Sequence, residues 1–303
     1  MNIITAVIPI FTLIALGWLA RSKGFMPPEF LGPANRLVYY LAIPAMIFRS
    51  ISKASLAGSF HFDVIAVTLL AVLLIFGIGW LSALIAHIGR RQIATFVQSA
   101  FHGNLGYIGL AVSYYYLGNE GLARAGILAG FVMIVQNLLA VSVLQFYADD
   151  ISFGRGRLVL KIIGNPVIVS SIAGMLFSLT GAQMPLIMGR SLDILSGMSL
   201  PLALLLIGAS LSFASARHHF GIVFFSTAAK LILLPGIGFF IYRFFALPRQ
   251  EYVPGLILLA SPTATIVFIM AQEMSGDSDL AVSAISLSTL LSALTFSLWL
   301  NLT

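Results

Sequence analysis

A lysine in the middle of an apolar stretch is the residue of this sequence best suited to bind a charged ligand. Lys230 lies at least ten residues from either end of the apolar segment 220–245. A charge so placed is costly, rare and usually functional. No acidic residue lies at a similar depth in any apolar segment. Its ammonium is therefore predicted to attract an anion directly or to replace a coupling cation. The alternative is that its long side chain reaches the polar end of the segment.

Two further polar residues, Asn104 and His102, occur together in the apolar segment 93–116. The amide of Asn104 both donates and accepts hydrogen bonds, which suits a carboxylate held beside free backbone N–H groups. Its alternative role is to cap the helix that follows Gly103. A histidine side chain ordinarily titrates near neutrality, so His102 is predicted either to carry a coupled proton or to be a packed, hydrogen-bonded residue.

Backbone-breaking residues interrupt two apolar segments near their middles. Three glycines occur in 103–109, and Pro262 lies in 260–265. Glycine and proline weaken helix bonds, so the freed polar groups must line protein or water. The predicted substrate contacts are Gly103, Asn104, Gly106, Tyr107, Ser261, Pro262, Thr263 and Thr265. Three more residues are candidates to line the same cavity, although the first two could instead tie helices together: Gln136, Asn137 and Asn35.

Composition restricts the class of protein. Apolar residues make up 59% of the chain, charged residues 9%, and the mean hydropathy is +1.03. A globular surface needs about a quarter of its residues charged, so this surface must face lipid. The net charge of +6 comes from dispersed basic residues, which excludes a nucleic-acid partner. There is no cysteine, and no metal-site or nucleophile motif is found. We expect no enzyme activity, no bound metal and no cofactor.

The apolar residues fall into ten segments, each close to the length of about 20 residues that crosses a bilayer. The predicted spans are 2–20, 31–51, 63–87, 93–116, 122–147, 159–180, 187–212, 220–245, 252–273 and 280–301.

The glycines and prolines of the first half recur in the second half. A shift of 157 residues superimposes Pro9 on Pro166 and Gly24 on Gly181. Each half would contain an odd number of spans, so the second half would enter the membrane inverted. We therefore predict an all-α integral membrane protein of ten transmembrane helices in two inverted five-helix repeats, with helices 4 and 9 broken and crossing. The repeats are 1–148 and 159–303, joined by a cytoplasmic loop at 149–158.

The distribution of Lys and Arg predicts the orientation. Eight basic residues lie in the loops after odd-numbered spans and six on the other side. The more basic side is normally cytoplasmic, which puts both termini outside. The predicted location is the plasma membrane, which is the inner membrane of a bacterium.

The order and spacing of several short stretches resemble the auxin efflux carrier family of secondary transporters along essentially the whole chain. The first is Asn-Arg-Leu-Val-Tyr-Tyr-Leu-Ala-Ile-Pro at 35–44, followed by Ala-Met-Ile-Phe. The others are 101–109, Asn-Pro at 165–166, 199–202 with 207–208, and Ala-Ser-Pro at 260–262.

The resemblance implies a fold shared with sodium/proton antiporters and bile acid/sodium symporters. Helices 1, 2, 6 and 7 would form a scaffold through which two copies dimerise. Helices 3–5 and 8–10 would form a moving transport domain. Relatives commonly have a proline just after the glycines of helix 4, where this chain has Leu110. The break would therefore rest on the glycines alone.

The predicted function is secondary active transport or facilitation of small organic anions such as carboxylates, directed outward. An elevator-type movement would carry the helix 4/9 crossover past the scaffold. One alternative is a cation/proton antiporter of the same fold, which would need carboxylates at mid-depth. Another is a sodium-coupled organic anion symporter, and coupling to H⁺ or Na⁺ is left open.

Overall fold

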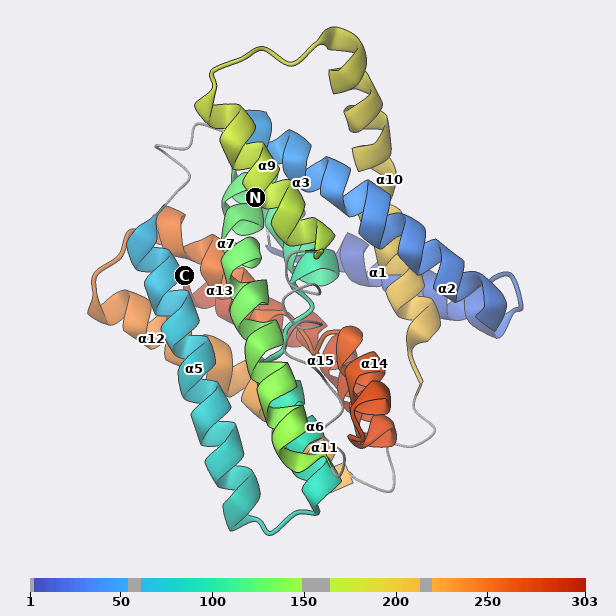
Figure 1. Cartoon of the computed structure of the whole chain (residues 1–303), viewed down its shortest axis with the longest axis vertical. Helices are drawn as coiled ribbons and strands as arrows, with labels where there is room; N and C mark the ends of the chain where they lie inside the picture. The colour runs from blue at the N-terminus through green and yellow to red at the C-terminus, as the bar shows by residue number, and fades with distance from the viewer. Residues whose placement is uncertain (1–2, 54–60, 149–163, 213–219) are drawn as a thin grey trace. The chain divides into compact units, whose positions relative to one another are not determined.

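The computed structural model describes residues 3–53, 61–148, 164–212 and 220–303. Figure 1 shows the course of the chain, and every regular element in these residues is helical. The elements are α1 (Ile3–Ser22), α2 (Pro28–Leu37), η1 (Val38–Ala42), α3 (Ile43–Lys53), α5 (Phe62–Ile85), α6 (Arg90–Phe101), η2 (Leu105–Gly109), α7 (Leu110–Tyr147), α9 (Pro166–Leu179), α10 (Leu186–Ser210), α11 (Phe220–Ala228), η3 (Ala229–Leu233), α12 (Leu234–Phe244), α13 (Arg249–Ala260), α14 (Ile266–Glu273) and α15 (Ser278–Leu302).

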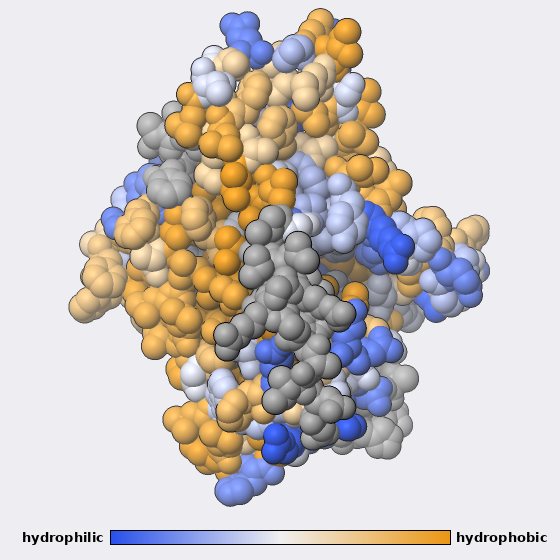
Figure 2. Space-filling view, in the orientation of Figure 1, coloured by the Kyte–Doolittle hydropathy of each residue, from blue (hydrophilic) through white to orange (hydrophobic). Residues whose placement is uncertain are grey.

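The helices carry the apolar surface expected of a membrane protein. Six helical stretches in the described residues are long and apolar enough to cross a bilayer. Large apolar side chains such as Leu81 and Ile85 are exposed, and apolar residues cover broad areas of the face in Figure 2. Exposing so much apolar surface to water would be unfavourable, whereas contact with lipid tails is not. The chain is an integral membrane protein.

Each of the ten predicted segments overlaps helix in the described residues. Segment 31–51 comprises α2, η1 and α3, while 93–116 and 252–273 are both interrupted. The inverted relation between the two halves stays a prediction, and the connecting loop predicted at 149–158 lies outside the described residues.

Glycines at equivalent positions of the repeat have the same backbone conformation. Gly24 follows α1 with φ 82°, and Gly181 follows α9 with φ 64°. Both values lie in the left-handed region, which glycine adopts without a steric cost. Gly118, with φ 73°, likewise interrupts the long helix α7 between the fourth and fifth predicted segments.

The chain forms two compact units. Unit 1 comprises Met1–His61, Gly106–Phe131 and Ile163–Leu211. Within it, α1 packs along α10, and α3 packs against α9 and α10. A side chain at Gly208 of α10 would collide with the carbonyl oxygen of Ile14 in α1. The backbones of these two helices are therefore in direct contact.

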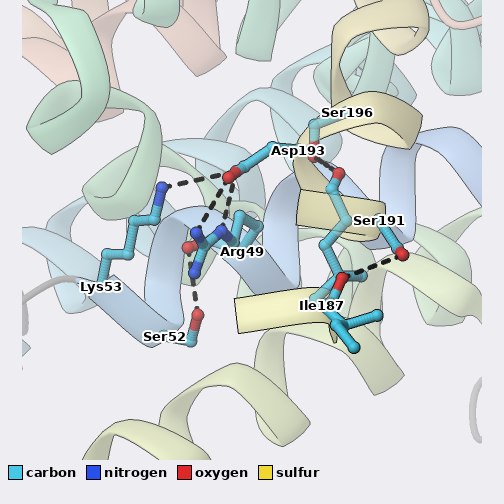
Figure 3. A network of polar contacts seen from close by, with 8 residues as sticks. Arg49, Ser52, Lys53, Ile187, Ser191, Asp193 and Ser196 are labelled. Carbon is cyan, nitrogen blue, oxygen red and sulfur yellow. Dashed lines mark hydrogen bonds and ion pairs between the residues drawn. The ribbon is translucent and has the colours of Figure 1, made fainter. Parts of the chain in front are cut away.

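An ion pair links α3 to α10 within unit 1. Arg49 donates from Nε and Nη2 to the two carboxylate oxygens of Asp193, at 2.7 and 2.9 Å. Lys53 adds a weaker contact at 3.4 Å (Figure 3). The side chain of Asp193 is 49% exposed, so water screens the pair and its stabilisation is about 1 kcal/mol at most. The pair fixes the position of α3 along α10.

Unit 2 comprises Phe62–Leu105, Val132–Ile162 and Ser212–Thr303. Its central element is α15, which packs against α6, α11, α13 and α14. A second long helix of this unit, α5, packs against α6, α12 and α13. The two interrupted helical segments, α6 and the pair α13 and α14, are thus held from several directions.

Prolines account for two widened turns. Pro44 and Pro235 each follow a π-helical segment, η1 and η3. In η3 the N–H of Leu234 donates to the carbonyl of Ala229, five residues back. Because proline has no N–H, a carbonyl one turn before it loses its partner. The indole N–H of Trp299 donates to the carbonyl of Leu231 at 2.8 Å and replaces that partner.

A Trp299→Phe variant should lose this bond while keeping most of the ring packing. Leaving a buried carbonyl without a donor costs about 1–3 kcal/mol, so we expect a lower melting temperature in detergent. A Trp18→Phe variant is the matched control, since that ring is 47% exposed. Equal melting temperatures for the two variants would contradict the assignment.

Candidate functional site

Two helix ends meet inside unit 2. Helix α6 ends at Phe101 and α13 ends at Ala260. The residue after each is extended, with ψ 94° at His102 and ψ 140° at Ser261. The chain therefore leaves both helices at the middle of an apolar segment.

The two extended stretches pair with each other. Gly103 and Thr263 form an antiparallel bridge. The N–H of Asn104 donates to the carbonyl of Pro262 at 2.7 Å, and the N–H of Ala264 donates to the carbonyl of His102 at 2.9 Å. These bonds satisfy backbone groups that the broken helices leave free. We call residues 102–104 and 261–264 the crossover.

The break in the first half is shorter than predicted. Only 102–104 are extended, and the chain is π-helical again from Leu105 to Gly109. Gly106 and Gly109 therefore lie in helix, and Leu110 begins α7 directly. The prediction that three glycines share the break was wrong, because pairing with 262–264 interrupts the helix at Gly103 alone.

Asn104 has a free hydrogen-bond donor in the crossover. Its side chain is 6% exposed. The amide nitrogen Nδ2 is buried and has no hydrogen-bond partner in the part of the chain that the structure describes. A buried donor without a partner costs free energy, so it indicates a place for an acceptor that arrives from outside.

The hydroxyls of the second half serve mainly to hold the crossover. Thr263 donates to the carbonyl of Ser99 at 3.0 Å, and its own N–H donates to Ser288 at 3.0 Å. Ser261 donates to the carbonyl of Ile257 in its own helix, a common use of hydroxyls in membrane helices. Thr265 is half-buried at the start of α14 and makes no side-chain cap.

Lys230 lies at the crossover. Its side chain is fully buried, and Nζ donates to the carbonyl of Leu259 at 2.7 Å. A Cβ on Gly103 would lie 3.3 Å from both Cε and Nζ, so the ammonium is close to the extended strand. No described carboxylate forms an ion pair with it. The side chain does not reach for the membrane surface.

Gln136 of α7 contacts the other helix end. Its Nε2 donates to the carbonyl of Phe101 at 2.9 Å, and the residue is 1% exposed. The two half-helix ends at the crossover are therefore each capped by a side chain from another helix. The end of α6 receives a neutral amide, whereas the end of α13 receives the ammonium of Lys230.

His102 is packed in its surroundings. Its ring stacks on Phe101 with centroids 5.9 Å apart, and Nδ1 lies 3.5 Å from Nε2 of Gln98. It is 4% exposed. This geometry favours the interpretation as a packed, hydrogen-bonded residue over that of a proton carrier.

Four candidates lie elsewhere. Gly106, Tyr107 and Asn35 belong to unit 1, where the Tyr107 hydroxyl donates to the Asn35 side chain at 3.4 Å. Asn137 donates to the carbonyl of Met133 in its own helix at 2.7 Å. Eight of the candidates form the crossover or lie against it in unit 2: Gly103, Asn104, Ser261, Pro262, Thr263, Lys230, His102 and Gln136.

Several supporting residues escaped the sequence reasoning. Ser288 and Gln98 contact the crossover from α15 and α6, and serine or glutamine in a span gives no signal by itself. A partner such as Trp299 could have been expected from the sequence, because Pro235 has no N–H and leaves the carbonyl of Leu231 without its helical donor.

The arrangement of broken, paired helices in an apolar fold is that of a membrane transporter. A family model described as "Membrane transport protein" matches residues 2–150 and 155–300. The chain belongs to this family, which confirms the resemblance to the auxin efflux carriers.

Curated relatives align along nearly the whole chain. An "Uncharacterized transporter" of Methanothermobacter thermautotrophicus is 27% identical, over 97% of this chain and 96% of that protein. A "Putative malonate transporter" of Rhizobium meliloti is 26% identical, over 95% of this chain and 92% of that protein. The class of protein is thus a membrane transporter.

Proposed function

We propose that this protein is a secondary transporter or facilitator of small organic anions, and that it binds a carboxylate at the crossover. The observation that carries the proposal is the buried amide donor of Asn104, which has no partner among the described residues. A carboxylate oxygen accepts such a bond. The ammonium of Lys230 at the same crossover favours a negatively charged ligand.

The cation/proton antiporter of the same fold has less support. Exchange of Na⁺ for H⁺ needs carboxylates within the membrane, which bind the two cations in competition. The buried polar residues of the described chain include a lysine, amides and hydroxyls, but no aspartate or glutamate. The amide donor of Asn104 and the ammonium of Lys230 are suited to an anion.

We further propose that alternating access moves the crossover relative to the predicted scaffold, as in an elevator. The division into two compact units supports this proposal, since predicted helices 1, 2, 6 and 7 fall in unit 1 and the crossover falls in unit 2. Residues 106–131 belong to unit 1, whereas the family resemblance implies that helices 4 and 5 lie wholly in the moving domain. Outward transport, homodimerisation through the scaffold and a plasma-membrane location complete the proposal.

Uptake by liposomes containing the purified full-length chain tests the function. The named relative makes a short dicarboxylate the first choice, so the panel includes malonate, succinate and acetate, with and without a pH gradient. Malonamide, which is similar in size but uncharged, is the control. We expect protein-dependent uptake of at least one carboxylate and none of malonamide. Sodium/proton exchange without uptake of any carboxylate would contradict the proposal.

A further inference from the structure

We propose that Lys230 is a built-in cation, which occupies the position that a coupling cation would otherwise take, so that anion transport by this protein needs no sodium. The inference rests on the proposed function and specifies its energetics. It rules out the sodium-coupled symporter, one of the alternatives that the sequence leaves open.

The first step is the charge of the crossover itself. The C-terminal end of a helix carries about half a negative charge, because its last carbonyls have no intrahelical partner. Helices α6 and α13 both end here, in buried surroundings. In transporters built from broken helices, such ends and the unwound carbonyls beside them are where coupling cations bind. A cation therefore belongs at this place on electrostatic grounds.

The second step is that the protein supplies this cation. The Lys230 ammonium donates to the Leu259 carbonyl, in the last turn of α13. It also lies against Gly103, where any larger residue would crowd Cε and Nζ. Lys230 comes from the widened turn η3, which is held by the bond from Trp299 to Leu231. The lysine is thus fixed at one helix end and beside the other strand.

The third step is the contrast with the other helix end. The carbonyl of Phe101 at the end of α6 receives only the neutral amide of Gln136. Among the described residues, the positive charge beside the crossover is that of Lys230, which lies at the end of α13. The positive charge of Lys230 offsets the partial negative charge at the two helix ends. The amide donor of Asn104 then remains available to an anion.

The experiment measures malonate uptake by the wild type and by a variant in which Lys230 is shortened to alanine. Wild-type uptake of malonate into liposomes should be equal within about twofold in sodium, potassium and choline media. A Lys230→Ala variant should lose at least tenfold in uptake. Ethylammonium, which resembles the missing end of the side chain, should restore part of this loss, whereas ethanol of similar size should not. Lys53→Ala is the matched control, since Lys53 contacts Asp193 in unit 1.

A second readout does not depend on transport. Ethylammonium should raise the melting temperature of detergent-purified Lys230→Ala and leave that of the wild type unchanged, because a ligand stabilises only a protein with a free site for it.

The outcomes separate this inference from the proposed function. Sodium-dependent uptake by the wild type would overturn the inference alone, even if the variant failed to fold. Equal effects of ethylammonium and ethanol on the variant would also overturn it. A wild type that takes up no carboxylate in any medium would instead contradict the proposed function.

Discussion

Replacing Asn104 with alanine should weaken carboxylate binding by about 10- to 150-fold while the protein stays folded. The side chain offers a buried donor that no described residue uses, and a hydrogen bond to a charged group contributes about 1.5–3 kcal/mol. Removing it should therefore cost ligand affinity and little stability. Binding of malonate, measured by calorimetry or by the ligand-induced rise in melting temperature, gives the affinity.

Asn137→Ala is the matched control for this variant. Asn137 lies in the same unit, but its amide already donates to the carbonyl of Met133. Its loss should leave the malonate affinity unchanged. If the two variants bind malonate equally well, Asn104 makes no substrate contact. If Asn104→Ala melts well below the wild type, Asn104 has a structural role.

The second large effect concerns stability. Gly208→Ala should destabilise the protein by about 3 kcal/mol or more, because the new methyl group would collide with the carbonyl oxygen of Ile14. A side chain could change its rotamer to relieve such a collision, but a helix backbone cannot. α1 and α10 would have to separate along their length. The measurement is the melting temperature and the monodisperse yield after extraction in detergent.

Gly197→Ala in the same helix provides the comparison. Nothing lies within 4 Å of the position that its Cβ would occupy. Alanine also favours a helix over glycine by about 1 kcal/mol. We expect this variant to be as stable as the wild type or more so. Equal behaviour of the two glycines would show that α1 and α10 do not pack as described.

The all-helical fold and the interruptions of two apolar segments could be predicted from the positions of apolar residues, glycine and proline. The shift that superimposes Gly24 on Gly181 pairs two glycines with left-handed φ angles after α1 and α9. Such positions can be found in a sequence because a backbone requirement appears directly as a residue type. The limits of the break at 103–109 could not be predicted in the same way. They depend on bonds to 262–264, which are distant in the chain.

The site was predicted in part. Asn104 and Lys230 were identified because polar groups in apolar segments are rare. Their partners were not, since Lys230 contacts a backbone carbonyl, and any residue in position 259 would supply one. The role of Gln136 was left open between lining a cavity and tying helices, and its bond to the carbonyl of Phe101 favours the second. Such choices depend on side-chain direction, which a sequence does not display.

The bond between Lys230 and Leu259 also has a consequence for biosynthesis. The two residues are 29 positions apart, so the lysine leaves the ribosome before its acceptor does. A lone lysine at the centre of a membrane helix costs about 2.5–3.5 kcal/mol during insertion. We therefore expect the segment that carries it to enter the bilayer together with the following helix, as a pair. Membrane insertion of this part of the chain would then have to wait until residue 260 has left the ribosome.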